Sequence, residues 1–162
     1  MTENVEKRLA AAQIFVPDAP SAAGNYAPYV VSRGHVYISG QTCRVDGQVA
    51  YKGMVGRDLS LMVGKLAARI CAINVLSQLK AACGGDLDRV SRCVRLGGFV
   101  CSDETFTQQP EVLNGASDVI LIAFGDAGRH ARTAVGVSVL PSNSAVEVDA
   151  IFELHDDYVK QP

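Results

Sequence analysis

The sequence has few of the residues that metal-binding and nucleic-acid-binding proteins use. Its three histidines are scattered along the chain, and no two of its five cysteines have Cys-x-x-Cys spacing. This lack of clustered ligands argues against a zinc site. The formal net charge is −2, so the chain lacks the excess of Lys and Arg that marks dedicated nucleic-acid binding, although a local basic patch stays open.

The chain also lacks a long apolar run. No segment approaches the roughly 18 uninterrupted apolar residues of a membrane span. The N-terminal stretch MTENVEKRLAAAQIF carries acidic residues and no apolar signal-peptide core. We therefore expect a cytoplasmic protein without membrane partners. An odd number of cysteines in ordinary helix and strand contexts predicts reduced, buried thiols.

What is present is the composition of a folded domain. The 162 residues are 48% hydrophobic and 20% charged, which suits one globular unit with a core. Residues 3–13 favour a helix, and the stretch 17–24, rich in Pro, Ala and Ser, reads as a connector. We therefore divide the chain into an N-terminal helix and linker, residues 1–23, and a main domain, residues 24–157.

Alternating apolar residues and turn signals predict the strands. VVSRGHVYISG, from Val30, contains two short β-rich runs around Ser-Arg-Gly, and Asp46-Gly47 marks a second hairpin turn. Residues 90–102 alternate between apolar and polar. In HARTAVGVSVLPSNSAVEVDAIFEL, from His130, two further runs of alternating residues flank a Pro-Ser-Asn-Ser connection.

Two segments predict helices. Residues 57–83 contain no proline, and apolar residues recur there at spacings of three and four: Leu59, Met62, Leu66, Ile70, Ile73 and Leu76. Pro110 opens a second helix that Gly125 can end, with the apolar stripe Val112, Leu113, Ala116, Val119, Ile120 and Ala123.

The order of these elements predicts an α+β domain with one mixed β-sheet and two helices on one face. The other face of the sheet also carries Val and Ile, and a chain of this size has nothing left to cover it. Association with copies of the same chain would bury that face.

Several of these segments resemble one known family. They are GNYAPYV from Gly24, YISGQ from Tyr37, the Asp-Gly turn, the Gly-Gly after the long helix, and ARTAVGVSVLP followed by VEVDAIFE. In this order and spacing they resemble the reactive intermediate deaminase (RidA/YjgF-like) family, also labelled endoribonuclease L-PSP. The resemblance covers residues 24–154, and the N-terminal helix looks like that of a divergent subgroup.

The resemblance implies a chorismate-mutase-like fold and a homotrimer whose three sheets form a closed barrel, with clefts between subunits. Active members of the family hydrolyse reactive imines or enamines, made from amino acids by pyridoxal-phosphate enzymes, to 2-keto acids and ammonia. The resemblance implies a small carboxylate as substrate and neither a cofactor nor a metal.

Two charged residues match the chemistry of the family. Arg132 matches the arginine that holds the substrate carboxylate, a role that suits the parallel donors of a planar guanidinium. Its strand position alone fits a salt-bridge arginine equally well. Asp149 falls where the family commonly has Glu to order the attacking water, and a structural carboxylate is the alternative. Glu147, on the same strand face, takes this role if the register differs.

The resemblance also marks residues that line the pocket. Tyr26 matches a tyrosine that closes it, and Ser39 and Gly40 match a Ser-Gly pair whose backbone N–H approaches the ligand. Asn114 matches an asparagine that borders the cleft, although it could instead fix its helix by bonding to the backbone. Cys43, just beyond this Ser-Gly-Gln, could face the cleft.

Three functions follow. The first is hydrolytic deamination of enamines or imines. The second is a trimer that binds small carboxylates without turnover, as a sensor or holdase, which the Asp149 departure keeps open. The third is an endoribonuclease, disfavoured because one arginine and one acid in a mildly acidic protein make a poor phosphate site.

Overall fold

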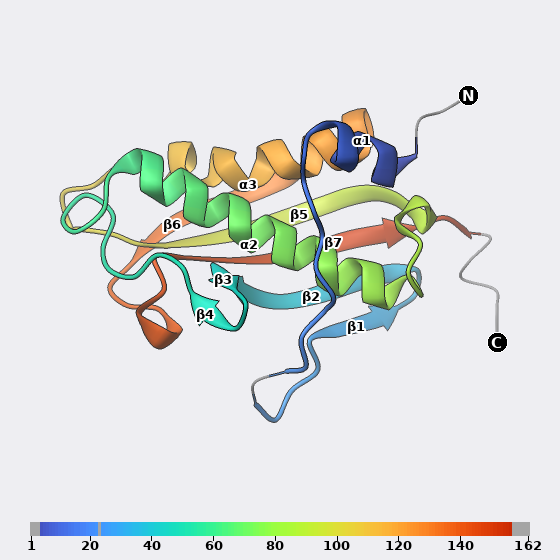
Figure 1. The fold of residues 1–162 in the computed structure, drawn as a ribbon, viewed down its shortest axis with the longest axis horizontal. Coiled ribbons are helices and arrows are strands. Elements are labelled where there is room, and N and C mark those ends of the chain that lie inside the picture. Colours follow the sequence, from blue (N-terminus) through green and yellow to red (C-terminus); the bar gives the residue numbers. More distant parts are fainter. Residues whose placement is uncertain (1–3, 23, 157–162) are drawn as a thin grey trace.

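The fold is a five-stranded sheet with its helices on one side (Figure 1), seen in a computed structural model that describes residues 4–22 and 24–156. The sheet order is β1-β2-β7-β5-β6, with β5 and β6 parallel and every other pair antiparallel. Its strands are β1 (Tyr29–Ser32), β2 (His35–Thr42), β5 (Val90–Cys101), β6 (Ala131–Val137) and β7 (Val146–Leu154). The predicted α+β fold with one mixed sheet of this kind is confirmed.

Both predicted hairpins form, and turn chemistry explains them. Arg33 and Gly34 connect β1 to β2 with φ of 48° and 77°, and Asp46 and Gly47 connect β3 (Arg44–Val45) to β4 (Gln48–Val49) with φ of 49° and 77°. Two consecutive positive φ values are typical of a type I′ turn, whose twist matches that of the flanking strands. Strands β3 and β4 form a separate two-stranded sheet.

Helix α2 (Leu61–Ala82) begins later than predicted and buries a different face. It starts after Ser60, whose hydroxyl accepts a hydrogen bond from the Val63 amide at 3.3 Å. The predicted stripe is wrong at Met62, which is 63% exposed, and at Leu66, which is also exposed. Its other members lie against the core: Leu76 is fully buried, and partly buried are Leu59, Ile70 and Ile73. The buried face consists mainly of small residues: Gly64, Ala67, Ala68, Cys71, Ala72, Val75, Leu76, Ser77, Gln78 and Leu79.

Close helix packing explains why the small residues lie inward. Helix α3 (Gln109–Phe124) lies beside α2 over the sheet (Figure 1). A side chain at Gly115 of α3 would collide with the backbone carbonyl of Lys65, and one at Gly64 would press on Val112. Large residues on this face of α2 would force the helices apart. The apolar stripe predicted for α3 is fully buried, and Gly125, with φ of 59°, caps the helix.

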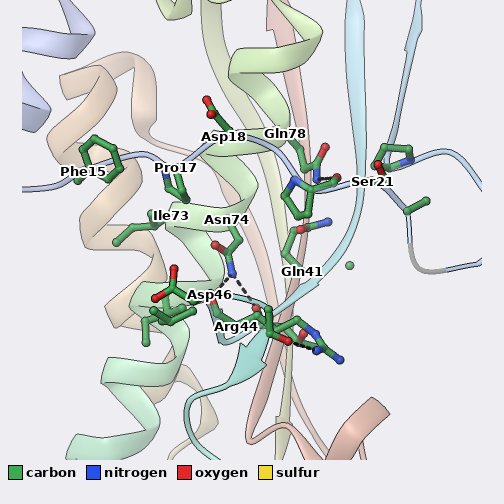
Figure 2. Close-up of a pocket in the computed structure, with 18 of the residues that line it drawn as sticks. Phe15, Pro17, Asp18, Ser21, Gln41, Arg44, Asp46, Ile73, Asn74 and Gln78 are labelled. Carbon is green, nitrogen blue, oxygen red and sulfur yellow. Dashed lines mark hydrogen bonds between the residues drawn. The ribbon is translucent and has the colours of Figure 1, made fainter.

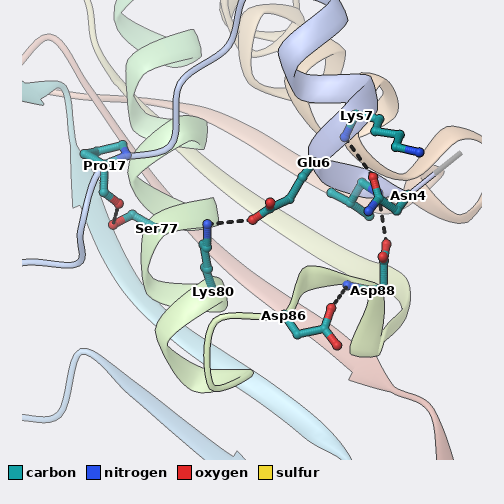
Figure 3. Close-up of polar contacts among 9 residues, drawn as sticks. Asn4, Glu6, Lys7, Pro17, Ser77, Lys80, Asp86 and Asp88 are labelled. Atoms are coloured by element: carbon teal, nitrogen blue, oxygen red, sulfur yellow. Dashed lines mark hydrogen bonds and ion pairs between the residues drawn. The ribbon is translucent and has the colours of Figure 1, made fainter.

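The N-terminal segment packs onto the same core. In α1 (Val5–Ala11), Val5 and Leu9 are buried, and the Asn4 side chain accepts from the Lys7 amide at 2.9 Å. The chain then crosses α2 (Figure 3), where the Ser77 hydroxyl donates to the Pro17 carbonyl at 2.8 Å. Residue 3, the first of the predicted helix, and residue 157, the end of the predicted main domain, lie outside the described residues. The predicted division at residue 23 stays a prediction.

None of the helices in the described part of the chain covers the second face of the sheet (Figure 1). Val30 and Tyr37 pair across β1 and β2 with exposed side chains, and Val135 of β6 is exposed as well. The expectation of an uncovered apolar face is confirmed for the single chain.

Helix α2 is also the one helix among the described residues with the length and composition to span a membrane. An 18-residue stretch of this helix has a mean hydropathy of 1.2. Half of the stretch is buried inside the fold, as in the core helix of a globular domain. All five cysteines are free and buried, as predicted.

Candidate functional site

Arg132 lies on β6, and its guanidinium is held by helix α3. Its Nη1 donates to Asn114 Oδ1 at 2.9 Å and to Ser117 Oγ at 3.1 Å, and its Nη2 donates to the Pro110 carbonyl at 3.1 Å. A guanidinium has five N–H donors. Three are therefore engaged in fixing the group, and two have no acceptor among the described residues.

A second layer of contacts orients Ser117. His130 Nδ1 lies 2.6 Å from the Gly128 carbonyl, which can only accept, so this nitrogen carries the proton. His130 Nε2, 3.0 Å from Ser117 Oγ, then accepts the hydroxyl proton. Burial lowers the pKa of His130, the hydrogen bond to Gly128 opposes this, and the charge of Arg132 lowers it further. The imidazole is therefore neutral at pH 7, and the chain of contacts runs from Arg132 to Gly128.

Two carboxylates lie on the uncovered face of the sheet, each over a glycine of a neighbouring strand. Asp149 lies over Gly97 of β5 and accepts from Arg95 Nη1 at 2.9 Å. Glu147 lies over Gly40 of β2, and no cation among the described residues comes within ion-pair distance of it. Burial raises the pKa of Glu147, and the nearby charge of Asp149 raises it further.

Tyr26, Ser39 and Gly40 are close together towards the β1 edge of the sheet, whereas Arg132 lies at the β6 edge. The Ser39 hydroxyl donates to the Ala27 carbonyl at 2.8 Å, and the Ser39 amide donates to the Pro28 carbonyl at 3.0 Å. These bonds attach the segment that carries Tyr26 to an irregularity in the pairing of β2 with β7, between Ile38 and Gln41. The Tyr26 ring is exposed.

The predicted site residues thus form three groups that one chain does not bring together. Arg132 pairs with Leu96, whose side chain faces the helices, whereas Asp149 pairs with Gly97 and faces the opposite side. Strands β7 and β5 separate Gly40 from Arg132 by three strand spacings, about 14 Å. Arg132 and Asn114 are neighbours, as are Tyr26, Ser39 and Gly40.

Sequence reasoning missed three residues of this arrangement. Ser117 and His130 complete the support of Arg132, and Arg95 pairs with Asp149. Helical spacing gave a usable signal for Ser117, because it lies three residues after Asn114 on α3 and so near the same face. For Arg95 only the register of β5 with β7 gives the answer.

Cys43 does not face a cleft. It is fully buried, with its sulfur 3.3 Å from the Tyr51 carbonyl and 3.2 Å from Ser144 Oγ. Within residues 4–22 and 24–156, no three His, Cys, Asp or Glu side chains gather in a way that could hold a metal ion.

Comparison with known proteins defines the class. The profile of the family described as "YjgF/chorismate mutase-like, putative endoribonuclease" matches residues 6–154. The chain belongs to this YjgF/chorismate mutase-like family.

Three relatives are similar over most of their length. Protein TCP17 of Trypanosoma cruzi is 49% identical over 144 residues, which are 88% of this chain and 89% of that protein. A structure from Agrobacterium tumefaciens, of unknown function, is 43% identical with a TM-score of 0.88, covering 93% of this chain and 92% of that one. A structure from Shewanella oneidensis, described as "a putative endoribonuclease", is 37% identical with a TM-score of 0.90. The match covers 94% of this chain and 100% of that one.

A more distant likeness concerns the fold alone. The structure of E. coli TdcF with bound serine is 21% identical with a TM-score of 0.61, covering 85% of this chain and 94% of that one.

Proposed function

We propose that the protein hydrolyses reactive enamine or imine intermediates to 2-keto acids and ammonia, in a cleft between two subunits of a homotrimer. The observation that carries the proposal is the guanidinium of Arg132, fixed by three acceptors with two donors left over. Two donors on one planar group suit the two oxygens of a carboxylate. The serine bound to TdcF is itself a small carboxylate.

The reaction needs a carboxylate anchor and an ordered water. Water adds to the imine carbon of R–C(=NH)–COO⁻, one of its protons passes to nitrogen, and the C–N bond of the resulting carbinolamine breaks. The products are R–CO–COO⁻ and NH₃. A protein carboxylate with a raised pKa assists by accepting a proton from the water and returning it to the leaving nitrogen.

Glu147 suits this second role better than Asp149. Arg95 Nη1 already donates to the Asp149 carboxylate at 2.9 Å, so this carboxylate is occupied by a guanidinium and is less available to hold a water. Glu147 has no such partner in the described part of the chain, burial raises its pKa, and it lies over Gly40, one of the predicted ligand-binding residues. We therefore assign the water-ordering role to Glu147 and a structural role to Asp149.

Assembly into a ring of copies would account for the distance between the groups within one chain. Arg132 and Asn114 lie at the β6 edge, whereas Tyr26, Ser39 and Gly40 lie towards the β1 edge. A ring of copies would place the β6 edge of one subunit beside the β1 edge of the next and bury the uncovered faces inside. The Arg132 group of one chain would then complete the Gly40 group of its neighbour.

The test couples a pyridoxal-phosphate serine or threonine dehydratase to the purified protein and follows release of keto acid and ammonia. Arg132→Ala should lower turnover at least about 30-fold, because losing a charged contact in a cleft costs about 2–5 kcal/mol. Arg129→Ala is the matched control, since this exposed arginine pairs only with Asp126 among the contacts found for it. Arg132→Lys, which keeps the charge but not the fork, should fall between the two.

Glu147→Gln should abolish most turnover, whereas Asp149→Asn should retain most of it. The reverse result would return the water-ordering role to Asp149. Full activity of Arg132→Ala would overturn the whole assignment. Binding of a 2-keto acid without any turnover would favour the carboxylate-binding trimer, and RNA cleavage lost in Arg132→Ala would favour the ribonuclease.

A further inference from the structure

A cavity lies under the N-terminal segment, and Arg132 is not among the residues that line it. Its volume is about 650 Å³, and it is bounded by the segment from Phe15 to Ala22, helix α2, the end of β2 and the β3–β4 hairpin (Figure 2). The apolar part of its wall includes Phe15, Pro17, Tyr26, Val45, Ile70 and Ile73. A cavity of this size and composition is typical of small-molecule sites.

The amide side chains of the cavity have their donors engaged. Asn74 Nδ2 donates to the carbonyls of Thr42 and Arg44, each at 3.0 Å. Gln78 Nε2 donates to the Pro20 carbonyl, and Gln41 Nε2 donates to the Ser39 carbonyl, each at 3.0 Å. Carbonyl partners fix which end of each amide is nitrogen. The oxygens of these three side chains accept no hydrogen bond from the described residues.

Of the three amides, Gln78 gives the strongest evidence for a bound molecule. Its side chain lines the cavity although the residue is only 2% exposed, and its Oε1 has no hydrogen-bond donor among the described residues. Buried side-chain acceptors in folded proteins nearly always have a partner. A missing donor is therefore expected to come from a bound molecule.

The charged residues of the cavity wall also favour a ligand that donates hydrogen bonds. Asp18 and Asp46 contribute two carboxylates to the wall. The one cation of the wall, Arg44, turns its guanidinium to the Gly47 carbonyl at 2.8 Å and to Ser142 Oγ at 2.9 Å. The hydroxyls of Ser21, Tyr26 and Thr42 can donate or accept, so the polar lining is dominated by acceptors.

We propose that this cavity binds a small molecule with an apolar body and an ammonium group. An ammonium supplies three donors and a positive charge, which match the amide oxygens of Gln41, Asn74 and Gln78 and the carboxylates of Asp18 and Asp46. The apolar walls accept the hydrocarbon part. Tyr26 and Gly40, which the proposed deamination also uses, line this cavity, whereas Arg132 does not. The expected preference for an ammonium rests on the acceptors of the cavity wall and not on the deamination, which requires a carboxylate instead.

The experiment compares three probes of equal length on the full chain: n-hexylammonium, hexanol and hexanoate. Binding is followed by NMR chemical-shift changes and by calorimetry. We expect hexylammonium to bind at least tenfold more tightly than either other probe, with shifts centred on Ile70, Ile73 and Tyr26. Equal affinity for hexanol, preference for hexanoate, or shifts centred elsewhere would overturn the proposal.

Charge-removing variants locate the site. Asp18→Asn and Asp46→Asn should each weaken hexylammonium binding at least threefold and leave hexanol binding unchanged. Asp126→Asn is the matched control, because it removes the same charge from a residue outside the cavity. An equal loss in all three would mean a general charge effect and would contradict the site. Gln78→Met, checked for folding by thermal denaturation, should also weaken hexylammonium binding, and unchanged affinity would exclude a role for Oε1.

Discussion

The carboxylate of Glu147 lies over the α-carbon of Gly40, in the space that a side chain at position 40 would occupy. The two residues belong to adjacent strands, β7 and β2, on the uncovered face of the sheet. Gly40 is therefore required here by its neighbour and not by its own turn geometry, and the pair ties one predicted ligand-binding residue to one acid.

Gly40→Ala should destabilise the protein by about 1–3 kcal/mol, because the added methyl group must displace the Glu147 carboxylate. Urea denaturation measures the change. The double variant Gly40→Ala with Glu147→Ala should recover part of the loss, since the two sites are in contact. Additive effects of the two substitutions would show that the contact has no energetic consequence.

Glu147→Gln should be stabilising at neutral pH even as it removes activity. Because burial raises the native pKa of Glu147, the native protein binds this proton more tightly than the unfolded chain does. The wild type therefore loses stability as the pH rises from about 4.3 through the native pKa, and Gln avoids this loss. The gain of the variant over wild type should be larger at pH 7 than at pH 4, measured by denaturant unfolding. A gain that is independent of pH would mean that Glu147 does not titrate abnormally.

His130 should titrate below its ordinary pKa of about 6.5, because burial and the charge of Arg132 disfavour the imidazolium. NMR titration should give a pKa for His130 below 6.5 and show the proton on Nδ1 at pH 7. The stability that comes from neutral His130 is present above about 6.5 and is lost as the pH falls through the native pKa. His130→Gln should reduce this acid loss, and a native pKa at or above 6.5 would contradict the contacts to Ser117 and Gly128.

Leu9→Ala should destabilise the whole protein by about 2–4 kcal/mol, because Leu9 is buried in the core that α1 shares with the rest of the fold. Glu6→Ala is the control from the same helix. It breaks the exposed pair with Lys80 and should cost less than about 1 kcal/mol. A separate, earlier unfolding transition in Leu9→Ala would instead mean that the N-terminal segment unfolds on its own.

Much of the fold could be predicted because its signals are local. The Asp46-Gly47 turn forms where residues tolerant of positive φ stand between two short β-rich runs. The stripe of α3 is buried as predicted because its opposite face is polar enough to decide the orientation. Helix α2 is apolar on both sides, so its sequence could not tell which face packs inward, and the close approach of Gly115 to Lys65 decided it.

The motif match predicts a set of candidate site residues but not their arrangement. The motif match led to Arg132, Asn114, Tyr26, Ser39 and Gly40. It did not indicate that the Arg132 group and the Gly40 group lie towards opposite edges of the sheet. The spacing of strands along the chain does not determine their order in the sheet, which is β1-β2-β7-β5-β6.

The sequence by itself determined the strands, the hairpin turns, the family and the residue types available for chemistry, since each depends on neighbours a few positions apart. Only the tertiary structure decided which helix face is buried, and that Arg95 engages Asp149 while Glu147 has no cation partner among the described residues. It also decided that three amide side chains line a cavity under the N-terminal segment. These depend on contacts between residues tens of positions apart, which packing and strand pairing bring together.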